Sequence, residues 1–281
     1  LTVHDVSLKR YYVNTVKTLL KVVLKNGREL SLTPLHPLKV KGEWIEASHL
    51  EPKMCLDRKF KTYQKSRSTT LLASLSDSRC LTEKINGSLA YLLGLMWDSN
   101  LSVIGDILFF RCTHNAFFKI QKSIKNIFMY QITERDIAEK TNSHYRITMN
   151  LASFAFLLAT NSLIKLEGNR IPLAIRSSSR EDIVAFICGL IDSTEENDAY
   201  ETENGQFASC IQEVGESVGV LFDKVFKNNK YHLNILAKHT DDETLELLQK
   251  YSTRIGEGNC IFRDIYGDPF EVVSVMEGAT A

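Results

Sequence analysis

The chain has 281 residues, 44% of them hydrophobic and 24% charged, so it can build one large domain or two ordinary ones around a real core. Its 34 Lys and Arg residues balance 34 Asp and Glu residues, and the net charge of +0 gives no general argument for nucleic-acid binding. No apolar run reaches the roughly 18 residues of a membrane span, and the N-terminus lacks the apolar stretch of a signal peptide.

The six cysteines are scattered along the chain, and none belongs to a C-x-x-C pair, which argues against a zinc site. Several lie in apolar runs, as buried and reduced thiols do. This usage predicts an intracellular protein, in the cytoplasm or the nucleus. The chain begins at Leu1 without an initiator Met, as expected of a processed product or an excised piece.

The first segment, 1–57, is predicted to be all-β. Apolar residues alternate or run together on both sides of Asn26 and Gly27, and Asn-Gly between two such runs is the strongest short hairpin signal. GEWIEASHL then predicts a further short strand and a turn. Residues 58–87 change to a basic stretch rich in Ser and Thr, which predicts a linker or an exposed arm.

From residue 88 the apolar residues take helical spacing. Helices are predicted over SLAYLLGLMWD, AFFKIQKSIKNIF, LASFAFLLATN, EDIVAFICGLIDS, ASCIQEVGESVGV and DETLELLQKYS, with strands over ILFFRC, HYRITM and YHLNIL. The tail, CIFRDIYGDPFEVVSVMEGATA, returns to β-type residues. The predicted fold class is therefore α+β, with a domain over 88–258 inserted in a β module that comprises 1–57 and 259–281.

The inserted domain contains an internal repeat. Gly94 and Gly189 lie near the ends of two apolar helices, 189 − 94 = 95 residues apart, and each is followed by a helix, a strand and another helix. A repeat of this size predicts two similar halves, about 88–168 and 169–258, that share an interface. The small residues Gly94, Cys188 and Gly189 are predicted to let the two helices approach closely.

Both repeated segments carry a family resemblance. ICGLIDSTE at 187–195 resembles the LAGLIDADG motif, and LLGLMWDSN at 92–100 resembles a diverged first copy. The preceding RIPLAIRSSSREDIVAF is similar to the segment before the second motif in intein-borne homing endonucleases. Within it, Ser179 and Asp182 have the spacing of a capping box that opens the second motif helix.

The flanks resemble the hedgehog/intein fold. GRELSLTPLHPLKV is similar to the intein block G-x(5)-T-x-x-H, matched here by Gly27, Thr33 and His36. DIYGDPFEVVSVMEG resembles the strand at which that fold resumes after its endonuclease insert. The chain is thus similar to an intein interior whose terminal splicing residues are missing, with a LAGLIDADG (DOD-type) endonuclease domain inside it.

The resemblance implies the fold, the activity and the partners. It implies two pseudo-symmetric αββαββα repeats inserted in a partial all-β intein module. It implies a monomer that binds double-stranded DNA, cleaves phosphodiester bonds with Mg²⁺, and lies between host protein flanks (exteins), with no membrane partner. Thr33 and His36 match the pair that assists the acyl shift at the upstream splice junction.

The catalytic acids of the family are substituted in this chain. The eighth letter of the motif, a metal-binding acid in the family, is Ser99 in the first copy and Thr194 in the second. A hydroxyl is a weak, neutral ligand beside a carboxylate. Asp98 and Glu195 each lie one residue away, about 100° around a helix, and are the candidate catalytic and metal-binding residues. The nuclease is therefore expected to be weakened or inactive.

Basic residues of the stretch 53–67 and of the segment just before the second motif helix are candidates for contacts with DNA phosphates, which would make binding sensitive to salt. The candidates are Lys53, Arg58, Lys59, Lys61, Arg170, Arg176 and Arg180.

Plainer interpretations stay open at this stage. Asp192 and Glu195 fit a solvated helix end, and the basic stretch 53–67 fits a linker. Lys119, Lys122 and Lys125 form a stripe that is more typical of the solvent face of an amphipathic helix. Three functions follow: a site-specific homing endonuclease, a non-cutting remnant retained only within a self-splicing protein, or a protein that binds DNA without cleaving it.

Overall fold

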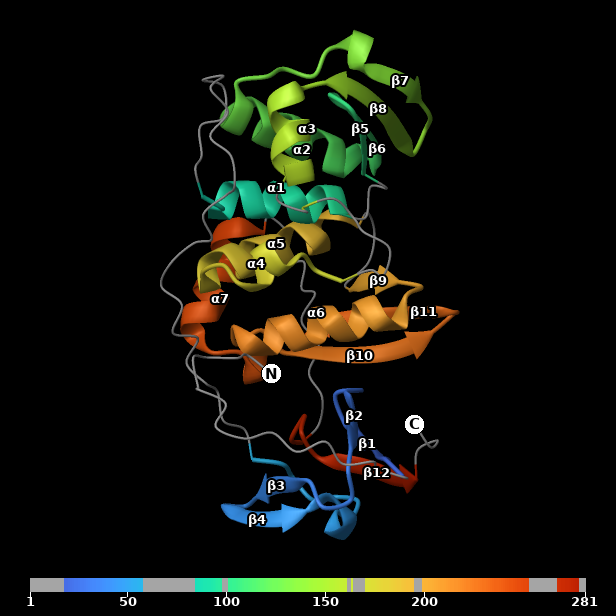
Figure 1. Cartoon of the computed structure of the whole chain (residues 1–281), viewed down its shortest axis with the longest axis vertical. Helices are drawn as coiled ribbons and strands as arrows, with labels where there is room; N and C mark the ends of the chain where they lie inside the picture. The colour runs from blue at the N-terminus through green and yellow to red at the C-terminus, as the bar shows by residue number, and fades with distance from the viewer. Residues whose placement is uncertain are drawn as a thin grey trace. The chain divides into compact units, whose positions relative to one another are not determined.

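The structure is a computed structural model, and it describes residues 18–57, 84–97, 101–160, 163, 170–194, 199–252 and 267–277. These residues belong to two units (Figure 1), one made of 18–57 with 267–277 and the other of 84–252. Each unit has its own apolar core. Both units contain small antiparallel sheets, and the larger one adds helices, so the mixed α and β character predicted from the sequence is confirmed.

The smaller unit is built from short strands. They are β1 (Leu20–Leu24), β2 (Glu29–Leu32), β3 (Pro37–Val40), β4 (Glu43–Glu46) and β12 (Val272–Glu277). Strands β1 and β2 pair as a hairpin around Gly27, which has φ of 73°, so the hairpin predicted at Asn26-Gly27 is confirmed. A positive φ at this position favours glycine.

The tail of the chain returns to the same sheet. Strand β12 pairs antiparallel with β1, which gives the order β12-β1-β2. Val22, Leu24 and Val272 from these strands are buried together in the core of the unit. Two segments about 250 residues apart in the chain therefore complete one sheet, as the β-type residues of the tail predict.

The larger unit has two halves, 84–160 and 170–252. Its helices are α1 (Gly87–Trp97), α2 (His114–Phe128), α3 (Ala152–Thr160), α4 (Leu173–Arg176), α5 (Arg180–Ser193), α6 (Gly205–Ser217) and α7 (Asp242–Tyr251). Its strands are β5 (Ser102–Ile104), β6 (Ile107–Thr113), β7 (Ile137–Lys140), β8 (His144–Asn150), β9 (Tyr200–Thr202), β10 (Phe222–Lys227) and β11 (Lys230–Ile235).

Each half carries its own sheet beside a central pair of helices. The first sheet has the order β5-β6-β8-β7 and the second has the order β10-β11-β9. Figure 1 shows α1 and α5 side by side between the two halves. The first half follows the expected αββαββα order. In the second half the described residues place one strand, β9, between α5 and α6, and 195–198 lie outside them.

Polar caps determine where the helices begin. The capping box predicted at Ser179 is confirmed: its hydroxyl accepts a hydrogen bond from the Asp182 backbone N–H, and Asp182 accepts one from the Ser179 N–H. Thr113, Asn204 and Asp241 cap α2, α6 and α7 in the same way. Each cap satisfies an N–H group that the helix itself leaves without a partner.

Helix α1 is apolar on all sides, and a helix of this kind has to be buried. Leu89, Leu92, Leu93, Leu95 and Met96 are each at most 1% exposed. No helix among the residues described by the structure is long and apolar enough to cross a membrane.

The Ser179 cap gives a first prediction. Ser179→Ala removes the acceptor for the Asp182 N–H, and we expect it to lower the free energy of unfolding by about 1 kcal/mol. Urea unfolding followed by circular dichroism measures the loss. Ser179→Asp keeps a capping oxygen and is expected to unfold close to the parent; equal losses in both variants would contradict the capping role.

Candidate functional site

The two motif helices touch through their glycines. A methyl group on Gly94 would collide with the Phe186 carbonyl oxygen and come within 3.0 Å of the Gly189 Cα atom. A methyl group on Gly189 would collide with the Tyr91 carbonyl oxygen and come within 2.9 Å of the Gly94 Cα atom. Only glycine allows two helix backbones to approach this closely.

The contact is reciprocal. Each glycine faces the carbonyl of the residue three positions before the other glycine, since 94 − 91 = 3 and 189 − 186 = 3. The side chains follow the same symmetry. The residue three positions before one glycine contacts the residue three positions after the other: Tyr91 contacts Asp192, and Phe186 contacts Trp97. The pairs have matching positions in the two halves, so a pseudo-two-fold axis passes between the glycines.

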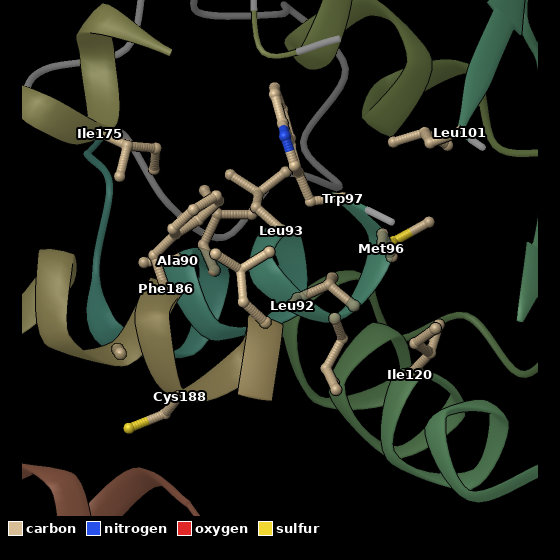
Figure 2. Close-up of a cluster of buried hydrophobic side chains, with 14 of the residues drawn as sticks. Ala90, Leu92, Leu93, Met96, Trp97, Leu101, Ile120, Ile175, Phe186 and Cys188 are labelled. Carbon is tan, nitrogen blue, oxygen red and sulfur yellow. The ribbon is translucent and has the colours of Figure 1, made fainter. Parts of the chain in front are cut away.

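The two side-chain pairs related by this axis differ in chemistry. On one side the rings of Trp97 and Phe186 meet edge to face with centroids 5.9 Å apart (Figure 2). On the other side the Tyr91 hydroxyl donates to a carboxylate oxygen of Asp192 over 2.8 Å. Burial and the neighbouring Asp192 raise the pKa of Tyr91, so its hydroxyl stays protonated and remains a donor.

Asp192 is completely buried and fully engaged. Besides Tyr91, the Ser252 hydroxyl at the end of α7 donates to its other carboxylate oxygen over 2.7 Å. The Lys119 ammonium group on α2 lies 3.1 Å from the carboxylate, and the Lys119 side chain is only 16% exposed. One buried carboxylate thus connects α1, α2, α5 and α7, and its charge is balanced by a fixed internal cation.

Two expectations from the sequence are corrected here. Asp192 is not a solvated helix end, because its side chain is 0% exposed. Lys119 does not share the solvent face of α2 with Lys122 and Lys125, because it turns inward to the carboxylate. Lysines three residues apart lie about 60° apart around a helix, so the first can face the core while the other two face solvent. The sequence spacing alone does not distinguish these positions.

Cys188 lies at a different contact from the one predicted. It points away from α1 (Figure 2), and its thiol donates to the Leu248 carbonyl of α7 over 3.7 Å. Burial and the nearby Asp192 raise the pKa of the Cys188 thiol, so it stays neutral. Its small size serves the packing of α5 against α7, whereas Gly94 and Gly189 make the contact between α1 and α5.

The candidate catalytic acids Asp98 and Glu195, and Ser99 with them, lie outside the described residues. Thr194 is described: it ends α5, and its hydroxyl donates to the Ile191 carbonyl over 2.8 Å.

The described residues do not fit a divalent cation. Within them no three His, Cys, Asp or Glu side chains are grouped to hold a metal ion. Asp192, in the last turn of α5, already binds an ammonium group and two hydroxyls. Mg²⁺ prefers several oxygen ligands with water among them, which a dry and fully engaged carboxylate does not offer.

The basic residues predicted to contact phosphates differ in whether their side chains are already bound within the protein. Arg180 is not available, because its guanidinium group donates to Asp241, Glu243 and Thr244 and to the Val218 carbonyl. It joins the start of α5 to the start of α7, and the phosphate role predicted for it is corrected to this structural one.

Arg170, Arg176 and Lys53 are exposed. Arg58, Lys59 and Lys61 lie outside the described residues.

In the smaller unit, Thr33 and His36 lie at the two ends of one turn. The His36 N–H donates to the Thr33 carbonyl over 2.9 Å, and the His36 carbonyl accepts from Ala47 over 2.9 Å. The His36 side chain is exposed. These two hydrogen bonds therefore fix the backbone of the turn that contains both predicted splicing-assist residues.

No protein-family model and no curated protein matches this chain. Among solved structures it is similar to I-DmoI in complex with DNA and Mn, at 16% identity and a TM-score of 0.42, over 60% of this chain and 98% of that one. It is also similar to I-DmoI in complex with DNA and Ca, at 16% identity and a TM-score of 0.40, over 59% and 88%. A third similar structure is from a study of mesophilic variants of the homing endonuclease I-DmoI, at 15% identity and a TM-score of 0.40, over 59% and 94%.

The glycine contact predicts a strong effect of one methyl group. Gly189→Ala gains about 1 kcal/mol in helix propensity, but it forces the α1 and α5 backbones apart, and overpacking of this kind costs typically 1–3 kcal/mol. Because the clash is with backbone atoms, which cannot turn aside, we expect a cost of about 2–3 kcal/mol, and therefore a net loss of about 1–2 kcal/mol in urea unfolding. Gly87→Ala is the control, because its methyl meets the end of the Tyr251 side chain, which can move. A Gly189→Ala protein as stable as the parent contradicts the close approach.

The buried ion pair predicts a second effect. Lys119→Met leaves the Asp192 charge buried without its cation, and we expect it to cost about 3–5 kcal/mol of unfolding free energy. Adding Asp192→Asn removes the charge; its amide oxygen accepts from one of the Tyr91 and Ser252 hydroxyls, and its NH2 group donates to the other, so the double variant is expected to recover most of the loss. Lys122→Met on the exposed side of α2 is the matched control. Failure of the double variant to recover excludes the charge as the cause.

Proposed function

We propose that this chain is a two-repeat DNA-binding protein of the LAGLIDADG type, in which cleavage is weakened or lost. The observation that carries the proposal is the reciprocal contact at Gly94 and Gly189, which joins two helices in the positions where the sequence resembles the two copies of the motif. Because both halves of the pseudo-two-fold lie in one chain, the protein acts as a monomer on double-stranded DNA.

The sheets support duplex binding. Each half presents an antiparallel sheet that packs against its own helix, α2 in the first half and α6 in the second (Figure 1), and two-stranded β-structure fits the major groove. With a net charge of +0, the binding energy has to come from local groups. Exposed arginines such as Arg111, Arg146 and Arg170 are available for it.

The loss of cleavage is supported by the ends of the two motif helices. The eighth motif letters are Ser99 and Thr194, which are poor ligands for Mg²⁺. Asp192, which is fully engaged by Lys119, Tyr91 and Ser252, offers no substitute. Any Mg²⁺-dependent nicking therefore depends on Asp98 and Glu195.

Selection from random duplexes at low salt tests this function. We expect a preferred duplex to emerge, with an affinity whose logarithm falls linearly with the logarithm of salt concentration, by about 0.9 for each phosphate neutralised. Incubation of the selected duplex with Mg²⁺ then measures nicking, which is expected to be slow or absent. No duplex preference in the selection contradicts the proposal, and fast cutting that survives Asp98→Asn and Glu195→Gln contradicts the role of these two acids.

A second candidate function has its own observation. The sheet β12-β1-β2 unites the two ends of the chain, as a β module interrupted by an insert requires, and Thr33 and His36 share one turn. These features support the alternative that the chain belongs to a self-splicing element between host flanks. Placing a nucleophilic residue upstream and His-Asn downstream in a longer protein tests it: spliced product is expected, and His36→Ala is expected to slow its formation.

A further inference from the structure

Helices α2 and α6 occupy equivalent places in the two halves of the larger unit. Each begins at a polar cap, Thr113 for α2 and Asn204 for α6, and each packs against the sheet of its own half. Counted from these caps, equivalent residues differ by 204 − 113 = 91. At this offset three buried residues of α2 match three buried residues of α6: Ala116, Phe117 and Ile120 match Phe207, Ala208 and Ile211.

A polar contact follows the same equivalence. The Gln121 side chain on α2 donates to the Ile132 carbonyl over 3.1 Å, and the Gln212 side chain on α6 donates to the Phe222 carbonyl over 3.1 Å. Since 212 − 121 = 91, the two glutamines match at the offset set by the caps. The two helices therefore share one pattern of buried contacts, and residues at matching positions lie on matching faces.

The outer faces of these helices carry opposite charges. Lys122 on α2 matches Glu213 on α6, since 213 − 122 = 91, and both are exposed. Three residues further along, the exposed Lys125 matches Glu216, which is half-buried. Helix α2 contains no Asp or Glu, and α6 contains no Lys or Arg. The first half therefore presents a basic helix face where the second half presents an acidic one.

These charges are not used within the chain. Among the residues that the structure describes, Lys122, Lys125 and Glu213 form no ion pair and no hydrogen bond. Lys230 and Lys250, by contrast, lie 3.4 Å and 2.6 Å from carboxylate oxygens. The net charge of +0 means that two copies of the chain do not repel each other overall. The basic face of one copy is thus complementary to the acidic face of another.

The basic face also offers apolar side chains. Phe118 lies four residues before Lys122, on the same side of α2, and it is 61% exposed. Met129, four residues after Lys125 at the end of the helix, is 81% exposed. Burial of an exposed aromatic ring favours association and adds to the attraction between the charges.

We propose that this face is a self-association surface, at which α2 of one copy packs on α6 of a second copy. Lys122 and Lys125 then face the carboxylates of Glu213 and Glu216. In a two-fold dimer the contact forms twice, because each copy supplies both helices. Like charges disfavour the alternative pairings of α2 with α2 and of α6 with α6.

The contact leaves the other side of the sheets free. Along β6 and β8 every second residue is buried, on the side covered by α2, so Arg111 and Arg146 lie on the outward face of the first sheet. Self-association through α2 and duplex binding through the outward face therefore use opposite sides of the sheet. The inference goes beyond the proposed function and does not depend on it.

The test reverses the charges of one matching pair in the full chain. Lys122→Glu makes both faces acidic, and Glu213→Lys makes both basic. Each variant alone is expected to dimerise about tenfold more weakly than the parent, as for the loss of two ion pairs. An equimolar mixture of the two variants is expected to regain the parent affinity, because both contacts of the mixed dimer join opposite charges. Sedimentation equilibrium at low salt measures the dissociation constants.

Three further measurements separate the contact from general charge effects. Glu246→Lys on the exposed side of α7 changes the net charge as Glu213→Lys does, and it is the matched control, with an expected change below about twofold. Phe118→Ala leaves the charge unchanged and is expected to weaken the dimer about tenfold, as for the loss of a central aromatic contact. Raising the salt concentration from about 0.01 M to about 1 M shortens the screening length from about 30 Å to about 3 Å and is expected to dissociate the parent dimer.

Several outcomes overturn the inference. They are a parent protein that stays monomeric at low salt, a mixture that does not regain affinity, assemblies larger than a dimer, and a loss from Glu246→Lys as large as that from Glu213→Lys. Circular dichroism establishes that each variant is folded. Duplex binding by Lys122→Glu is expected to equal that of the parent, so a dimer that binds no duplex contradicts the proposed function alone, and a monomer that binds duplex contradicts self-association alone.

Discussion

The larger unit depends on one backbone contact, the approach of Gly94 to Gly189. Without a Cβ atom at either position, the carbonyls of Tyr91 and Phe186 come against the opposite helix, and the two halves share one continuous core. The two sheets are therefore held through the helix pair and its flanking helices rather than through each other, since they are separate sheets. A glycine in the middle of a helix costs about 1 kcal/mol against alanine, and the interface offsets that cost at both positions.

The equivalent positions around this contact have diverged in chemistry. One side has an aromatic pair, and the other has a buried carboxylate that needs a cation. Once Asp192 is placed in the core, Lys119 has to follow it, because an isolated buried charge costs several kcal/mol. That requirement joins α2 of the first half to α5 and α7 of the second. The network therefore adds a polar, geometrically demanding link between the halves, in addition to the glycine contact.

Periodicity alone predicted every α-helix that the structure describes except the one-turn α4, and the strands β6, β8 and β11, because each has one buried face or is buried throughout. It did not predict the short strands β5, β7 and β9. It missed β10, although Asn228 and Asn229, with φ of 53° and 60°, are the two-residue turn that joins β10 to β11. Asn-Asn between two apolar runs is a hairpin signal, weaker than Asn-Gly. The buried network was not predictable, because Lys119 and Asp192 are 73 residues apart, 192 − 119, and each is ordinary in its own segment.

The end of α5 and the outward face of the first sheet are built from separate sets of side chains. The end of α5 is occupied by interactions that hold the fold: Asp192 by its internal partners, and the Thr194 hydroxyl by the Ile191 carbonyl. Asp192 cannot turn to a metal ion without leaving the buried Tyr91 and Ser252 hydroxyls and Lys119 without their partner. The outward face of the first sheet has no such role, because Arg111 and Arg146 are exposed there and lie opposite each other in the strand register. Under the proposed function, a protein built in this way can lose its catalytic acids and keep an affinity for duplex DNA, because the two properties would reside in side chains that do not support one another.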